Sequence, residues 1–95
     1  MLLVTPVAFA AGNAAAGKKV AEQVCAACHG LNGISTMSNV PNLAGQKQAY
    51  LVSQLKGFRH GTIKNATMDS MASSISSQDV TNVAAYYSGL KSCKQ

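Results

Sequence analysis

The segment CAACHG, residues 25–30, holds the most chemically specific residues of the chain. Cys25 and Cys28 are three residues apart, and His29 follows the second cysteine directly. On a helix this spacing puts both cysteines on one face, with His29 four residues beyond Cys25. Two sulfurs and one imidazole would then lie on the same side of one turn. Three kinds of site use such groups: a thiol redox pair, a zinc site and a covalent anchor for haem.

The haem interpretation is favoured because it uses all three groups at once. Cys25 and Cys28 would form thioether bonds to the haem vinyl groups, His29 would bind the iron, and C-x-x-C-H is the spacing typical of that attachment. A thiol redox pair does not need the histidine and normally adjoins a βαβ pattern, which is missing here. Zinc would need a fourth ligand from Cys93 or His60, and neither belongs to a second spaced pair. These two alternatives stay open but are less favoured.

The second axial ligand of the iron would come from Met37, Met68, Met71 or His60. Met37 follows His29 closely and should still cover the histidine side, although at ~3.3 Å per residue its reach would suffice. Met68 and Met71 are three residues apart and could exchange roles on one helical turn. Met68 ends an irregular stretch, whereas Met71 better suits packing. Spacing alone favours Met68 without deciding, and His60 is the rival if both methionines fail.

Hydrophobic spacing and capping signals predict helices that would position these residues. Asn13 is a suitable N-cap for the first, and Gly17 in its middle suggests close approach of another element. Ser76 and Asp79 resemble a capping box. The predicted helices cover residues 13–27, with a possible extension to 29, residues 46–58, and residues 76 or 77 to 89. Residues 30–45 and 59–76 are expected to be irregular, with one helical turn around Met71. No strand is expected, so the fold class is all-α.

The composition sets limits on the domain and its partners. A chain of 95 residues forms one domain, and with 5% aromatic residues and no tryptophan it has few large side chains to fill a core. A buried porphyrin would supply the apolar surface that so small a domain needs. The net charge is +5, but the basic residues are scattered, which does not fit nucleic-acid binding. They form either a solvated surface or one that steers the protein toward an acidic partner.

The N-terminal residues 1–10, MLLVTPVAFA, resemble the remnant of an export signal ending in an A-x-A cleavage pattern. Cleavage would leave residues 11–95 as the single domain, in the oxidising periplasm. The run is too short to span a bilayer, so no stable membrane insertion is expected. An ordinary apolar strand or helix is the alternative. Cys93 is left over, and either pairs two chains into a dimer or is an exposed thiol.

Several segments together resemble the small class I bacterial cytochromes c. The likeness covers residues 13–90 and is greatest to one half of the periplasmic dihaem cytochromes c and to their single-haem relatives. The segments that carry it are CAACHG at 25–30, PNLAGQ at 41–46, Tyr50-Leu51, Gln54-Leu55, SSQDV at 76–80 and NVAAYY at 82–87. The resemblance implies a class I cytochrome c fold, with three to five helices wrapped around one covalently bound haem c.

The resemblance also implies roles for particular residues. Met68 stands seven residues before Ile75, the family position of the ligand methionine, so Met68 becomes the expected ligand and Met71 the runner-up. Pro41 is expected to offer its carbonyl to the Nδ1–H of His29. Tyr86 is expected where the first and last helices cross, facing Gly17. The residues expected to line the haem pocket are Pro41, Leu43, Leu55 and Phe58.

His/Met ligation closes both axial positions of the iron and raises its reduction potential. The expected function is therefore a periplasmic electron carrier, not an enzyme. It would meet acidic redox partners transiently, such as a membrane cytochrome complex, an oxidase or a reductase. The alternative is a haem enzyme or gas sensor with an open or weakly held sixth position.

Overall fold

A computed structural model describes residues 12–92 of the chain. The elements are α1 (Ala14–Val20), the π-helical turn η1 (Ala21–Cys25), α2 (Ala26–His29), α3 (Gln48–His60), α4 (Ala66–Ser73) and α5 (Ser77–Ser88). Within the described residues there is no strand, which confirms the all-α prediction. No helix of residues 12–92 has the length and hydropathy needed to span a membrane. The expected export signal at 1–10 and Cys93 lie outside the described residues.

The first helical segment is continuous from α1 through η1 to α2. Its start was predicted correctly, because the Asn13 side chain accepts a hydrogen bond from the backbone N–H of Ala16 at 3.0 Å. The helix continues to His29 and ends at Gly30, whose φ of 81° is readily adopted only by glycine. The CAACHG motif therefore lies at the end of one helix. His29 is the last residue of that helix, and Gly30 is its C-cap.

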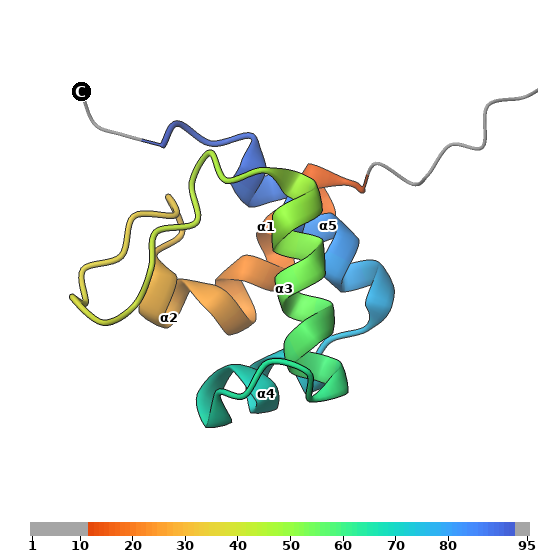
Figure 1. Cartoon of the computed structure of the whole chain (residues 1–95). Coiled ribbons are helices and arrows are strands. Elements are labelled where there is room, and N and C mark those ends of the chain that lie inside the picture. Colours follow the sequence, from red (N-terminus) through yellow and green to blue (C-terminus); the bar gives the residue numbers. More distant parts are fainter. Residues whose placement is uncertain (1–11, 93–95) are drawn as a thin grey trace, which may run out of the picture.

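Helices α1 and α5 cross in close contact, behind α3 in Figure 1. A Cβ atom at Gly17 would lie 2.0 Å from the backbone oxygen of Asn82, so the expected close approach is confirmed. The Asn82 side chain also accepts a hydrogen bond from the backbone N–H of Asn13 at 2.9 Å. The backbone that faces Gly17 is thus that of Asn82 and Val83, while Tyr86 lies one turn further along α5.

Helix α5 begins as its sequence predicts. The Ser76 hydroxyl accepts from the Asp79 N–H at 3.0 Å, and the Asp79 carboxylate accepts from the Ser76 N–H at 3.1 Å, which is a complete capping box. The apolar stripe of α5 faces inward, toward α1 and α3. The core cluster consists of Ala21, Leu51, Val83, Ala84 and Tyr87.

Two predicted boundaries were wrong. Helix α3 covers Gln48–His60, two residues later than expected at both ends. It ends where the chain turns at Gly61, with φ 77°. Residues 66–73, expected to be irregular with a single turn, form the two-turn helix α4 at the foot of α3 (Figure 1). Its cap is Asn65, whose side chain accepts from the Met68 N–H at 3.0 Å.

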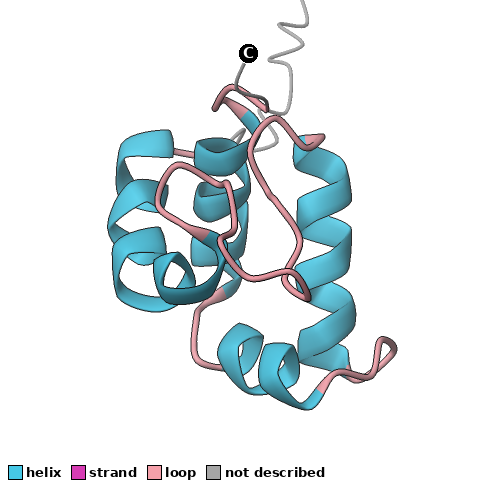
Figure 2. Ribbon diagram, turned by 90° about the vertical axis from the view of Figure 1, so that its left-hand side faces the viewer, coloured by secondary structure: helices cyan, strands magenta, loops and turns pink. Residues whose placement is uncertain are grey.

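The segment between α2 and α3 is a long loop, as predicted. Figure 2 shows it in front of the helices when the molecule is seen from the side of α2. The carbonyl of Gly33 accepts hydrogen bonds from the N–H groups of Leu43 and Ala44, at 2.8 and 3.1 Å. These bonds fold the loop back on itself, so that Pro41 and Leu43 return toward the helix that carries CAACHG.

Candidate functional site

The two cysteines of CAACHG lie at the end of the first helical segment. Cys25 ends the π-helical turn η1 and Cys28 lies in α2; both are half-buried and free, so the pair is not a disulfide. Burial raises the pKa of the Cys25 thiol to about 11. Reactive thiol pairs need a lowered pKa, so this environment does not suit thiol redox chemistry. A π-helical turn holds one extra residue and is frequent at functional sites. Here the π-helical turn begins at Ala21, which is buried in the core, and ends at Cys25.

His29 is held in one tautomer. The residue is 8% exposed, and its Nδ1 lies 2.8 Å from the carbonyl oxygen of Pro41. Because a carbonyl can only accept, Nδ1 carries a proton, and in the neutral form of the ring the lone pair is then on Nε2. This is the form of histidine that binds a metal through Nε2, with the second hydrogen bond fixing the ring. The contact that the resemblance implied between these two residues is confirmed.

The turn after His29 is tied to α5 by two tyrosines. The Tyr87 hydroxyl donates to the carbonyl of Gly30 at 3.0 Å, and the Tyr86 hydroxyl donates to the carbonyl of Leu31 at 2.6 Å. Sequence reasoning missed both bonds. The available signal was the adjacent pair of tyrosines, in a chain that has three.

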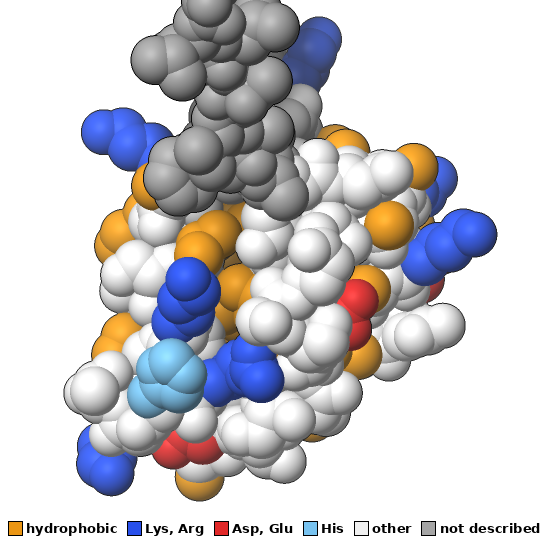
Figure 3. All heavy atoms as spheres, turned by 90° about the vertical axis from the view of Figure 1, so that its right-hand side faces the viewer, with side chains coloured by type: hydrophobic (Ala, Val, Ile, Leu, Met, Phe, Trp, Pro, Cys, Tyr) orange, Lys and Arg blue, Asp and Glu red, His pale blue; other side chains and the backbone are white. Residues whose placement is uncertain are grey.

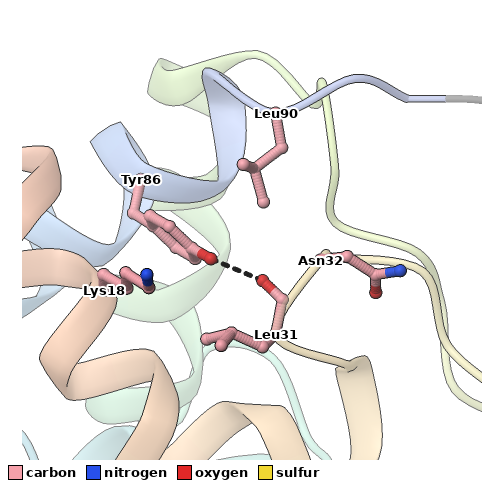
Figure 4. A pocket seen from close by; sticks show the side chains of 5 residues that line it. All are labelled: Lys18, Leu31, Asn32, Tyr86 and Leu90. Carbon is pink, nitrogen blue, oxygen red and sulfur yellow. Dashed lines mark hydrogen bonds between the residues drawn. The ribbon is translucent and has the colours of Figure 1, made fainter.

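A surface hollow of about 500 Å³ lies beside the Tyr86 hydroxyl. Its lining residues are Lys18, Leu31, Asn32, Tyr86 and Leu90, and Figure 4 shows the Tyr86–Leu31 hydrogen bond among them. Neither cysteine of CAACHG lines it, nor does His29. The hollow therefore borders the turn after His29 without reaching the three groups of the motif.

The expected pocket residues come from the loop and from α3. Leu43 and Leu55 are both half-buried and pack against the same core cluster as Cys25. Phe58 is half-buried one turn beyond Leu55 on α3, and Pro41 is exposed except for its carbonyl bond to His29. Leu43, Leu55 and Cys25 thus all border one core cluster.

The candidate second ligands lie on other elements. Met68 and Met71 are both on α4, where Met68 is half-buried in the first turn and Met71 is 41% exposed. Met37 is 44% exposed in the loop, and His60 is exposed at the end of α3. Burial therefore favours Met68 among the methionines, in line with the sequence-based expectation. Its bond to iron stays a prediction.

Comparisons with known proteins decide the family. The family model described as cytochrome c matches residues 14–91. The chain belongs to the cytochrome c family. Cytochrome c4 of Pseudomonas aeruginosa is 41% identical over 87 residues, covering 92% of this chain and 43% of that protein. Cytochrome c-554(548) of Halomonas halodenitrificans is 44% identical over 82 residues, covering 82% of this chain and 96% of that protein.

The fold agrees with this assignment. A solved cytochrome c4 structure from Acidithiobacillus ferrooxidans superposes with a TM-score of 0.76 at 36% identity, covering 82% of this chain and 49% of that one. The expected class I cytochrome c fold is therefore confirmed. The chain spans less than half the length of the cytochrome c4 relatives, at 39–46%. It is similar in length to the single-domain Halomonas protein.

The cofactor of a cytochrome c domain is one covalently attached haem c. The residues present fit this group. CAACHG offers two free thiols and an imidazole whose Nε2 is available. Half-buried apolar side chains of the loop and α3, including Leu43 and Leu55, provide the apolar surroundings that a porphyrin requires.

Proposed function

We propose that this domain is a periplasmic one-electron carrier whose haem is tethered by Cys25 and Cys28 and whose iron is held by His29 and Met68. The observation that carries the proposal is the hydrogen bond from His29 Nδ1 to the Pro41 carbonyl, within an intact C-x-x-C-H motif. When bound, the haem supplies an iron that alternates between ferric and ferrous states.

The protein residues would act by holding their positions in both oxidation states. The Pro41 carbonyl makes His29 a more basic ligand and prevents its ring from rotating. The Met68 thioether would favour ferrous iron and, together with His29, would leave no position on the iron for a substrate. A site closed on both sides suits electron transfer better than catalysis or gas binding.

The surface charge supports partners that are acidic. Figure 3 shows Lys and Arg side chains spread over one face of the molecule, interspersed with uncharged atoms. The net charge of +5 would attract a negatively charged redox protein and raise the rate of a weak encounter. Membrane cytochrome complexes, oxidases and reductases are the proposed classes of partner. A periplasmic location rests on the export-signal pattern at 1–10. Pairing of two chains through Cys93 remains part of the proposal, as a minor form.

The ligand set is tested by spectra of the holoprotein and of two variants, Met68→Ala and Met71→Ala. Ferric haem with a methionine ligand has a weak near-infrared band from sulfur-to-iron charge transfer. We expect Met68→Ala to abolish this band and Met71→Ala to keep it, because only the bound sulfur contributes. Met71→Ala is the matched control, since it changes the same residue type three positions along α4. Loss of the band in Met71→Ala alone would assign the ligand to Met71.

Carbon monoxide distinguishes an electron carrier from a haem enzyme or sensor. With both axial positions held by the protein, the ferrous domain should bind carbon monoxide poorly, and Met68→Ala should bind it readily. Rapid binding to the unmodified ferrous protein would contradict the closed site.

A further inference from the structure

Two hydroxyl groups from α5 hold the turn that follows His29. The carbonyls of Gly30 and Leu31, the first two after His29, accept from the hydroxyls of Tyr87 and Tyr86 at 3.0 and 2.6 Å. Donors and acceptors are 57 and 55 residues apart in sequence, so these bonds join the two ends of the domain. We infer that Tyr86 and Tyr87 are positioning residues for His29, and that their hydroxyls set its strength as an iron ligand. This inference rests on the proposed role of His29.

The geometry of the pair suits a rigid support. The two rings meet edge to face, with centroids 5.1 Å apart and planes inclined at 62°, an arrangement in which aromatic rings attract each other. Tyr87 is only 1% exposed and belongs to the core cluster, while Tyr86 packs against that cluster. Neither ring can move far without disturbing the crossing of α1 and α5. The hydroxyls are therefore fixed points for the turn.

The turn needs support because it follows a helix end. The last carbonyls of a helix and those just beyond it lack intrahelical partners. Gly30 has φ 81°, and its carbonyl also accepts from the Gly33 N–H at 3.0 Å. Losing the Tyr87 hydroxyl would leave Gly30 with that second bond. Losing the Tyr86 hydroxyl would remove the 2.6 Å bond to Leu31, the shorter of the two. We therefore expect Tyr86 to contribute more than Tyr87.

The link to the iron runs through the backbone of His29. The ring is held by Pro41 on the loop, and the peptides just after it are held by α5. If the turn loosens, Nδ1 moves relative to the Pro41 carbonyl and their hydrogen bond weakens. When this hydrogen bond weakens, the imidazole donates less electron density to the iron, and a less basic ligand stabilises ferric iron less. Removing the hydroxyls should therefore shift the equilibrium toward ferrous iron.

The experiment compares holoproteins carrying Tyr86→Phe, Tyr87→Phe or both, since phenylalanine removes the hydroxyl and keeps the ring. Tyr50→Phe is the matched control, because Tyr50 is 49% exposed on α3. In the ferrous protein, NMR measures solvent exchange of the His29 Nδ1 proton. Redox titration gives the reduction potential, and urea gives the unfolding midpoint.

We expect Nδ1–H exchange to be at least about tenfold faster in the double variant, by analogy with the effect of losing outer partners of metal-bound histidines. The ferrous-to-ferric ratio should rise about threefold to tenfold, where tenfold corresponds to 59 mV for one electron. Tyr86→Phe should show the larger single effect, and Tyr50→Phe none.

A purely structural role for the tyrosines predicts a different result. The unfolding midpoint would fall while Nδ1–H exchange under native conditions and the potential stayed at the values of the unmodified protein, and that outcome would overturn the inference. If the double variant does not fold, the two single variants decide by the same criteria. Failure of the proposed Met68 ligand appears separately, as a near-infrared band that is missing from the unmodified protein or that persists in Met68→Ala. Either result leaves the proton-exchange result interpretable.

Discussion

Replacing Gly17 with alanine tests whether the close crossing of α1 and α5 holds the domain together. The added Cβ would lie 2.0 Å from the Asn82 carbonyl oxygen, 2.5 Å from its carbon and 2.9 Å from the Val83 nitrogen. All three are backbone atoms, so no side-chain rotation relieves the collision. Restoring ordinary contact at 3.4 Å requires the helices to part by about 1.4 Å, the difference between 3.4 and 2.0 Å.

The magnitude follows from two opposing terms. Overpacking costs about 1–3 kcal/mol, and a backbone collision belongs at the upper end of that range. A gap of ~0.5–1 Å already forfeits a quarter to a half of each dispersion contact along the crossing. Alanine returns about 1 kcal/mol through its higher helix propensity. The net loss is therefore about 2 kcal/mol, which lowers the Tm of a domain this size by about 8–16 °C.

The assay is thermal and urea unfolding of the holoprotein, followed by far-ultraviolet circular dichroism. Gly89→Ala is the matched control, because Gly89 has φ −83° and a Cβ there would lie 3.5 and 3.7 Å from its nearest neighbours. The control should unfold at or slightly above the temperature of the unmodified protein. Equal unfolding temperatures for Gly17→Ala and Gly89→Ala would refute the idea that this contact limits stability.

Two further predictions concern α4 and alkaline pH. Asn65→Ala removes the cap of α4 and should cost that helix about 1 kcal/mol. The near-infrared band should therefore be lost at a lower urea concentration than in the unmodified protein. Asn39→Ala is the control, because Asn39 is exposed in the loop between α2 and α3. Burial raises the pKa of the Tyr87 hydroxyl above its ordinary value of 10, with a smaller contribution from Tyr86. The unfolded chain therefore loses this proton first, and stability should fall as the pH rises above 10. We expect the urea midpoint to fall less steeply with pH above 10 in Tyr87→Phe than in the unmodified protein. If both proteins lose stability equally, the loss comes from another titrating group.

The sequence predicted the helix starts correctly where a cap residue lies within a few positions of the backbone group that it binds. The capping box of Ser76 and Asp79 and the cap at Asn13 depend on side chains within three residues of the groups they bind. Helix α4 was predicted only as a single turn around Met71, because it is short and has a weak apolar stripe, although Asn65 was an available cap signal. Gly57 meets a constraint that no local pattern marks: it is buried within α3, where a Cβ would lie 2.5 Å from the Ile63 side chain.

The residues of the candidate site also divide into those that are close in sequence and those that are not. Spacing alone identified Cys25, Cys28 and His29, because the motif is contiguous in sequence. The Pro41 contact followed only from the family resemblance, since residue spacing does not predict which ring a loop carbonyl will bind. The tyrosine contacts were not foreseen at all. They join residues 55 and 57 positions apart, and no periodic pattern records such a pairing.

The two proposed ligands of the iron are held by different parts of the domain. His29 ends the first helical segment, which crosses α5 at Gly17 and is tied to it again by Tyr86 and Tyr87. Met68 belongs to α4, which packs against α3. Because α3 also packs against α5, it is the element that joins the two sides. Weakening the cap of α4 should therefore release the sulfur side while the histidine side stays in place, whereas parting α1 from α5 should disturb the histidine side first.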